Sequence, residues 1–195
     1  MVVFDGVPAT FTTAQARLAG VHFRDLYAAR DSGLLMELSR GLFRKSEAPT
    51  PTYPDLLAIS RRAPRAVVCL LSAAAVHELT DELPEAVQLA VPRGTWAPTI
   101  TFPPVEVFVW DRAHFELGIS QVEAAPGEPV RVYSPTRTVV DLMRLRLRIG
   151  EAPAHIALRR YLARPGARVS ELMEFSAALG VLGPVRTLVE ALIAS

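Results

Sequence analysis

Two stretches with a helical spacing of apolar residues open the chain, and an extended stretch follows them. The pattern predicts a capped helix over residues 11–21, with a turn at Gly20, and a second helix over residues 22–32. Residues 34–44 predict a β-hairpin with Arg40 at its tip. Helix, glycine turn, helix and basic hairpin in this order are typical of a winged helix-turn-helix. That fold places one helix in the DNA major groove and the hairpin on the DNA backbone.

A proline-rich segment separates this pattern from the rest of the chain. Residues 49–54 contain three prolines, which disfavour a helix and favour an extended, semi-rigid spacer. The 195 residues, half of them apolar, are enough for two small domains with their own cores. We therefore predict a winged helix-turn-helix domain at 1–48, a linker at 49–54 and a second domain at 55–195.

Beyond the linker, the pattern changes from helical to extended and back to helical. Ser134 and Pro135 predict a strong helix start, because serine caps the helix and proline loses no hydrogen bond at the first position. Strands in the middle with helices at both ends predict an α+β fold, in which a small central sheet is flanked by helices. The predicted elements are helices at 55–63 and 69–79, strands at 87–91, 105–110, 119–123 and 130–133, and helices at 135–148, 152–163, 169–179 and 184–194.

The second predicted helix has one face suited to DNA. On a helical wheel, Leu26 and Ala29 lie on one side, and Arg24 and Tyr27 lie on the other. Arg24 can bind a guanine edge or a phosphate with two hydrogen bonds, and Tyr27 can bind a phosphate. The predicted DNA-binding residues are His22, Phe23, Arg24 and Tyr27 on this helix, and Arg40, Arg44 and Lys45 on the hairpin.

The charge is distributed unevenly, although the net charge is only +1. Residues 51–130 contain five arginines and ten carboxylates, whereas residues 131–195 contain ten arginines and five carboxylates. This asymmetry predicts a basic surface on the C-terminal third, which is either a solvated face or a polyanion-binding surface. Its candidate residues are Arg137, Arg144 and Arg148 on one helix and Arg159 and Arg160 on the next. A structural alternative for Arg137 is an i,i+4 ion pair with Asp141.

Candidate catalytic chemistry is sparse. His77 and Glu78, followed by Asp81 and Glu82, could suggest a metal site, but no second histidine lies at a ligating spacing, so an acidic helix end is the preferred interpretation. Cys69 lies among apolar residues and is read as a small buried hydrophobe rather than a nucleophile. The sequence contains no glycine-rich phosphate loop, and no lysine after position 45 for a nuclease centre. We therefore expect no enzymatic activity, no metal and no cofactor.

The expected location is the cytoplasm. A single cysteine excludes an internal disulfide and is typical of a reducing compartment. The longest apolar run, residues 66–76, is too short to span a bilayer, and the first residues lack the pattern of a signal peptide.

Short strings along the chain also carry a resemblance to a known family. They lie at 11–16, 26–27, 33–35 and 40–44 in the first half, and at 68–73, 76–77, 89–94 and 132–141 in the second. Together they resemble the AbiEi family, antitoxins and transcriptional repressors of bacterial type IV toxin–antitoxin systems. The resemblance extends from about Phe11 to Leu192, and Ser-Pro-Thr-Arg-Thr-Val-Val-Asp at 134–141 is its most specific string.

The resemblance implies a function in abortive infection, a form of phage defence. The protein would bind an inverted repeat in its own promoter, as a dimer on DNA, and repress a two-gene operon. Its C-terminal domain would counter a nucleotidyltransferase-like toxin, with or without direct contact. Two alternatives stay open. One is a protein-interaction module whose winged helix no longer reads DNA, favoured by the phosphate-repelling Asp25 and Asp31; the other is an enzyme acting on nucleic acid.

Overall fold

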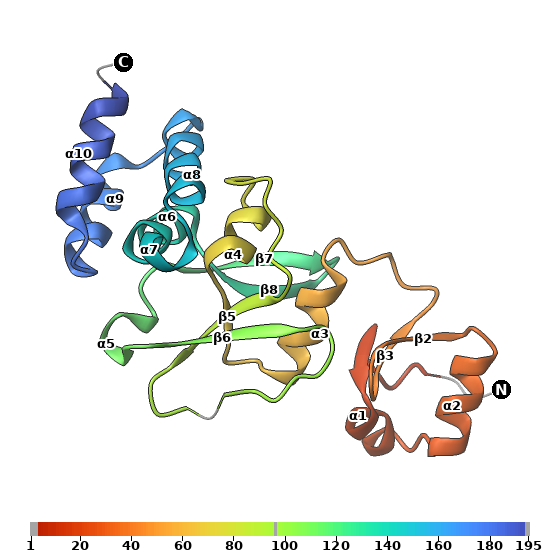
Figure 1. Ribbon diagram of the computed structural model, residues 1–195. Coiled ribbons are helices and arrows are strands. Elements are labelled where there is room, and N and C mark those ends of the chain that lie inside the picture. The colour runs from red at the N-terminus through yellow and green to blue at the C-terminus, as the bar shows by residue number, and fades with distance from the viewer. Residues whose placement is uncertain (1–3, 96, 194–195) are drawn as a thin grey trace. The chain divides into compact units, whose positions relative to one another are not determined.

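The computed structural model describes residues 4–95 and 97–193 and divides them into two compact units (Figure 1). Unit 1 comprises Met1–Pro64, Thr99–Pro104 and Glu123–Val130, and unit 2 comprises Arg65–Pro98, Val105–Val122 and Arg131–Ser195. Unit 1 therefore extends past the segment predicted as a linker and includes the helix after it. It also includes two segments from the second half of the chain, which no local sequence pattern signals.

Unit 1 begins with a three-stranded sheet and two short helices. Its elements are β1 (Thr10–Thr12), α1 (Thr13–Leu18), α2 (Phe23–Asp31), β2 (Leu35–Ser39), β3 (Leu42–Lys45) and α3 (Pro54–Arg62). The sheet order is β1-β3-β2, with both pairs antiparallel. The two helices and the hairpin lie where the sequence predicted them. Strand β1 was missed, because three residues are too few to show alternation.

Helix α1 starts two residues later than predicted because Thr12 caps it. The Thr12 hydroxyl accepts a hydrogen bond from the Gln15 amide at 3.3 Å, and the Gln15 side chain accepts one from the Thr12 amide at 2.8 Å. Gly20 then has a φ of 82°, which lets the chain turn sharply between α1 and α2. The core beneath these helices contains Val7, Phe11, Ala16, Val21, Leu26, Ala29, Leu35 and Phe43.

Unit 2 is built on a five-stranded mixed sheet in the order β6-β5-β4-β8-β7. The strands are β4 (Val67–Val68), β5 (Val87–Pro92), β6 (Val105–Trp110), β7 (Ile119–Ala125) and β8 (Glu128–Tyr133). Strand β4 pairs antiparallel with β5 and parallel with β8, and β5 pairs parallel with β6. The sequence predicted the four longer strands, but it missed β4, which has only two residues. The hairpin tip between β7 and β8 belongs to unit 1.

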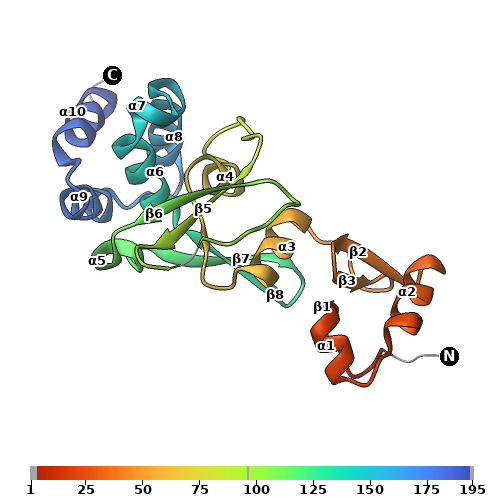
Figure 2. The ribbon, with the colours of Figure 1, turned by 60° about the horizontal axis from the view of Figure 1, so that its bottom comes forward.

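Helices pack beside this sheet, and α6 to α10 gather on one side of unit 2 (Figures 1 and 2). The helices are α4 (Leu70–Val76), α5 (Arg112–Phe115), α6 (Pro135–Arg144), α7 (Arg146–Ile149), α8 (Glu151–Ala163), α9 (Val169–Ala178) and α10 (Leu182–Ile193). Helix α6 packs against α4, α8 and α9. No helix among the described residues is both long and apolar enough to cross a membrane. Because the chain combines these helices with the two sheets, the fold is α+β.

The helix predicted at 69–79 is shorter than expected and ends at Val76, and α5 was not predicted. Two predicted helices nearer the C-terminus also differ from the observed ones. The helix predicted at 135–148 is interrupted at Leu145, whose ψ of 15° departs from helical geometry. Arg146 stabilises the break by donating a hydrogen bond from its guanidinium to the Met143 carbonyl at 2.8 Å. The predicted last helix, 184–194, begins two residues earlier, and Ala194 lies outside the described residues, as do Met1–Val3 of the signal-peptide expectation.

Arg137 is the largest of the nearly inaccessible side chains in unit 2, with 1% of its surface exposed. Its Nε donates to Asp141 at 2.8 Å, which confirms the i,i+4 pair. Its Nη1 donates to the carbonyls of His114 and Leu117 at 2.7 and 2.6 Å. A buried guanidinium needs such partners, because an unpaired charge away from water is very costly. Arg137 thereby fixes α6 to α5 and to the turn after it.

Aromatic rings complete the surroundings of this ion pair. The guanidinium of Arg137 lies 5.0 Å from the Trp110 ring centroid and 4.6 Å from that of Tyr133. Arg144 pairs with the second oxygen of Asp141 at 3.0 Å and lies 5.1 Å from the Trp110 ring. Asp141 therefore has two cationic partners, and the rings pack between strand ends and α6.

We predict that Arg137→Ala destabilises the protein by about 3–5 kcal/mol, because the substitution leaves the buried Asp141 carboxylate without its closest partner. The free energy of unfolding in urea measures this effect. Arg159→Ala is the matched control, since Arg159 is exposed on α8 and its removal should change stability by less than about 0.5 kcal/mol. Equal stability of the two variants would contradict the structural role of Arg137.

Candidate nucleic-acid interface

One side of α2 faces solvent. The Arg24 side chain is 90% exposed, and Phe23 and Tyr27 are 49% and 38% exposed. Leu26 and Ala29 on the opposite side are buried in the core of unit 1. The division predicted from the helical wheel is therefore the one observed. We call His22, Phe23, Arg24 and Tyr27 the α2 outer face.

Arg17 extends this surface, and the sequence analysis did not single it out. Its guanidinium lies 5.4 Å from the centroid of the Phe23 ring. Arg17 and Phe23 line a cavity of about 310 Å³ together with Gly20, Val21 and His22. The sequence feature that could have identified Arg17 was its position in the last turn of α1, three residues before Gly20. The turn at Gly20 brings this end of α1 beside the start of α2.

Carboxylates offset part of the positive charge on α2. Asp25 lies 3.2 Å from Arg24, and Asp31 lies 2.8 Å from Arg30. Arg30 also pairs with Glu37 on β2 at 2.9 Å, and the other oxygen of Glu37 accepts a hydrogen bond from the Gly41 amide at the hairpin turn. These contacts connect α2 to the hairpin. The hydrogen bonds to Glu37 and Asp31 raise the pKa of Arg30 further above the physiological range.

The hairpin presents Arg40 at its tip. Arg40 is exposed, and its carbonyl accepts a hydrogen bond from the guanidinium of Arg62 on α3. The same guanidinium donates from Nε to the Ser39 hydroxyl at 3.1 Å. Lys45, at the end of β3, is half-buried. Helix α3 therefore holds the hairpin tip in place while the Arg40 side chain stays accessible.

Arg44, predicted as a phosphate contact, is placed differently. Only 3% of its surface is exposed, because its guanidinium donates to the Thr10 hydroxyl at 2.6 Å, to Glu128, and to the Pro49 carbonyl at 2.5 Å. A buried and paired arginine is not available to DNA phosphates. The sequence could not reveal this, because Glu128 lies 84 residues further along the chain.

Glu128 is the centre of this cluster. Its second oxygen accepts a hydrogen bond from Arg61 on α3 at 2.8 Å. Burial by itself would raise the pKa of Glu128, but the hydrogen bonds from Arg44, Arg61 and Thr10 outweigh it and hold the pKa below its usual value. The carboxylate is thus ionised at neutral pH. It connects the tip of the β7–β8 hairpin to β3 and to α3 within unit 1.

The arginines predicted as a basic surface on unit 2 are mostly paired. Arg137 is buried and is no part of a surface, and Arg144 contacts the same buried carboxylate. Arg148 on α7 pairs with Glu106 at 2.9 Å, and Arg160 on α8 pairs with Asp81. Arg159 is exposed and forms no ion pair within residues 4–95 and 97–193.

The residues that were considered and rejected as a metal site make other contacts in the structure. The His77 ring nitrogen Nε2 lies 2.7 Å from the Tyr133 carbonyl, and burial lowers the pKa of His77. Asp81 instead pairs with Arg160, and its pKa is lowered by the hydrogen bond from that guanidinium. In the part of the chain that the structure describes, no three histidine, cysteine or carboxylate side chains are grouped as metal ligands would be.

Comparison with known proteins identifies the first part of the chain. Residues 8–44 match the family model described as "Transcriptional regulator, AbiEi antitoxin". Over these residues the predicted resemblance to the AbiEi family is confirmed; the strings predicted at 68–141 lie outside the match. The matched residues run from just before β1 to within β3, so they carry α1, α2 and most of the hairpin, and the AbiEi match does not extend to unit 2.

No curated protein matches the chain. Among solved structures, the crystal structure of the RV2827C protein from Mycobacterium tuberculosis aligns with a TM-score of 0.47 at 14% sequence identity. The alignment covers 93% of this chain and 75% of that one.

We predict that Glu128→Gln destabilises the protein by about 1.5–3 kcal/mol at pH 7, because two arginines lose their charged acceptor. The pKa of Glu128 is lowered in the folded state, so its contribution is present at neutral pH and is lost as the pH falls through that lowered pKa. Urea unfolding of both proteins at several pH values checks this. The difference in unfolding free energy should shrink in acid; a constant difference would contradict the proposed ion pairs.

Proposed function

We propose that this protein is a DNA-binding transcriptional regulator whose first 48 residues form a winged helix-turn-helix. In this proposal, α2 is the recognition helix and the β2–β3 hairpin is the wing. The observation that carries it is the anchoring of α2 by Leu26 and Ala29, which leaves Arg24 and Tyr27 exposed on the opposite side. The AbiEi match over residues 8–44 supports the same assignment.

Each exposed residue has a role in this proposal. Arg24 binds a guanine edge in the major groove, Tyr27 binds a phosphate, and His22 and Phe23 contact the groove near the start of α2. Arg40 binds the DNA backbone from the hairpin tip, with Lys45 beside it. Arg17 joins the set because it lies against Phe23. Arg44 is excluded, since it is buried against Glu128.

The proposal extends to the operon by similarity to the matched family. The protein would act in the cytoplasm, bind an inverted repeat in its own promoter as a dimer and repress a toxin–antitoxin operon. The residues from 55 onward would counter the nucleotidyltransferase-like toxin, and the accessible arginines Arg148, Arg159 and Arg160 are the proposed contact surface. A regulatory family description also favours a protein without catalytic activity.

A second candidate is a protein-interaction module that does not read DNA. The ion pairs of Arg24 with Asp25 and of Arg30 with Asp31 favour it, because they place carboxylates beside the side chains that would meet phosphates. The exposed apolar side chains of Leu34 and Met36, each 57% exposed, would then serve a protein contact.

Arg24→Ala should weaken binding to the promoter fragment by about 1–3 kcal/mol and weaken binding to a scrambled fragment much less, because a base contact is lost. Arg40→Ala should weaken binding to both fragments alike and reduce the salt dependence by about one phosphate contact. Fluorescence anisotropy over a series of salt concentrations measures both effects. Arg93→Ala, at an exposed arginine of unit 2, is the matched control.

Equal affinity of the unaltered protein for the promoter and the scrambled fragment would overturn the DNA-reading proposal. It would favour the interaction module instead.

Arg148→Glu combined with Arg159→Glu should abolish relief of toxin-induced growth arrest and leave promoter repression intact, because neither residue belongs to the α2 outer face. Both side chains are accessible, and the exposed pair of Arg148 with Glu106 contributes little stability, so the protein should stay folded. Co-expression with the toxin, alongside a promoter fusion, measures the two activities. Arg24→Ala is the reciprocal control, losing repression and keeping relief. A charge-reversed protein that loses repression but still neutralises the toxin would contradict this assignment.

A further inference from the structure

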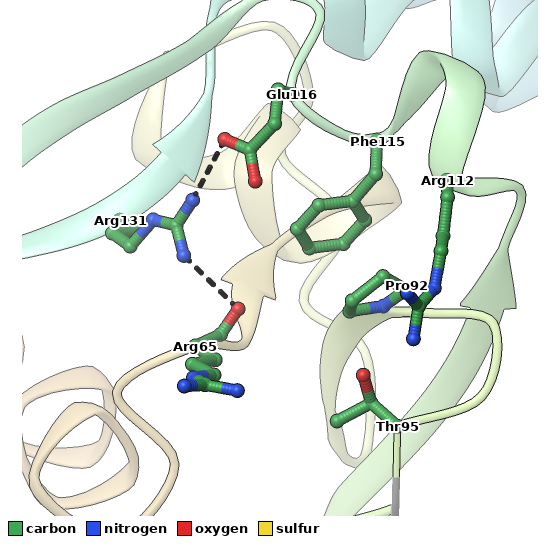
Figure 3. Close-up of a pocket in the computed structure, with 7 residues that line it drawn as sticks. All are labelled: Arg65, Pro92, Thr95, Arg112, Phe115, Glu116 and Arg131. Atoms are coloured by element: carbon green, nitrogen blue, oxygen red, sulfur yellow. Dashed lines mark hydrogen bonds and ion pairs between the residues drawn. The ribbon is translucent and has the colours of Figure 1, made fainter.

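Three arginines, none of them part of the buried Asp141 cluster, surround one cavity of unit 2. The cavity has a volume of about 430 Å³, and the residues that line it are Arg65, Pro92, Thr95, Arg112, Phe115, Glu116 and Arg131. Figure 3 shows Arg65 and Arg131 on one side, Arg112 on the opposite side and the Phe115 ring between them. Three cations and one carboxylate give this small space a surplus of positive charge.

The sheet register brings these residues together. The antiparallel register that pairs Val67 with Ala90 places Arg65, just before β4, opposite Pro92 at the end of β5. The parallel register of Val68 with Val132 places Arg131 beside the same end of β4. The strand ends therefore converge from segments that lie far apart in the sequence, and the short helix α5 adds Arg112 and Phe115.

Two of the three guanidinium groups are held in position by backbone groups. Arg131 donates to the Arg65 carbonyl at 3.1 Å and to Glu116 at 3.2 Å (Figure 3). Arg112 donates from Nε to the Arg93 carbonyl at 2.7 Å, which leaves its two terminal nitrogens for a ligand. Gly94 permits this approach, because a Cβ atom there would lie 3.3 Å from a terminal nitrogen of Arg112.

Arg65 has the fewest contacts of the three arginines. Its side chain is exposed and forms no hydrogen bond or ion pair within residues 4–95 and 97–193. Glu116 has a 75% exposed side chain and pairs only at the edge of the cavity with Arg131. Planar guanidinium groups match the oxygens of phosphate with paired hydrogen bonds. An anion between Arg65 and Arg112 would therefore meet donors from both sides.

The size and apolar lining of the cavity indicate more than an inorganic ion. A volume of about 430 Å³ lies in the range of sites for small organic ligands. Pro92, which is half-buried, offers an apolar wall beside the arginines; Phe115 also lines the cavity, but it is only 3% exposed. We propose that this cavity binds a small organic phosphate, with its phosphate between the arginines and its organic part against Pro92. The site lies in unit 2 and is independent of the DNA-reading surface on α2.

Isothermal titration calorimetry of the full chain tests this proposal with three probes at constant ionic strength. The probes are AMP, inorganic phosphate and adenosine. AMP should bind saturably with one molecule per chain, phosphate should bind more weakly, and adenosine should bind least. Binding of phosphate as tight as that of AMP, or of adenosine as tight as that of AMP, would overturn the assignment of an organic phosphate. Absence of saturable binding by AMP would overturn the site.

Three substitutions and one control locate the binding. Arg65→Ala and Arg112→Ala should each weaken AMP about tenfold, as expected for the loss of a charged hydrogen bond. Glu116→Gln should strengthen it, because Arg131 loses its competing carboxylate, and a merely structural role for Glu116 would not produce that gain. Arg186→Ala removes an equal charge from an exposed position on α10 that does not line the cavity, and it should leave affinity unchanged. A loss of affinity in Arg186→Ala equal to that in Arg65→Ala would overturn the proposal; circular dichroism confirms that each variant is folded.

Discussion

The buried ion pair of Arg137 with Asp141 is the constraint around which unit 2 is arranged. A guanidinium with 1% exposure must have all its charge met by protein groups, and here those groups come from α6, from α5 and from the turn after α5. The same requirement explains why Trp110 and Tyr133 lie over it. An apolar pair would fill the volume, but it would not orient three elements by directed hydrogen bonds.

Unit 1 uses the same chemistry in a second place. Arg44 and Arg61 converge on Glu128, and Arg30 bridges α2 to the hairpin through Glu37. Arginine is suited to this because its guanidinium can donate in several directions at once. An arginine-rich sequence is therefore a weak indication of a basic surface, since many of its charges are met inside the fold. The arginines that stay accessible, rather than the total number of arginines, decide where an anion can bind.

Much of unit 1 could be predicted from the sequence, because its elements are local. The two faces of α2 follow from residue spacing, and the hairpin follows from its position between Gly33 and Arg44. Strands β1 and β4 were missed since they are too short to show a pattern. The burial of Arg44 could not be predicted either, because it depends on Glu128, which only the fold brings near. The grouping of arginines around the cavity of unit 2 could not be predicted for the same reason.

The hairpin of β7 and β8 has a consequence for how such a chain can change. Its tip, Glu123–Val130, folds with unit 1, whereas Arg131 to Tyr133 of β8 fold with unit 2. A recombination event that exchanged the first 48 residues for those of another protein would leave Glu128 dependent on whatever replaced Thr10 and Arg44. The first 48 residues are therefore not freely interchangeable, and their evolution is tied to a single carboxylate encoded far downstream.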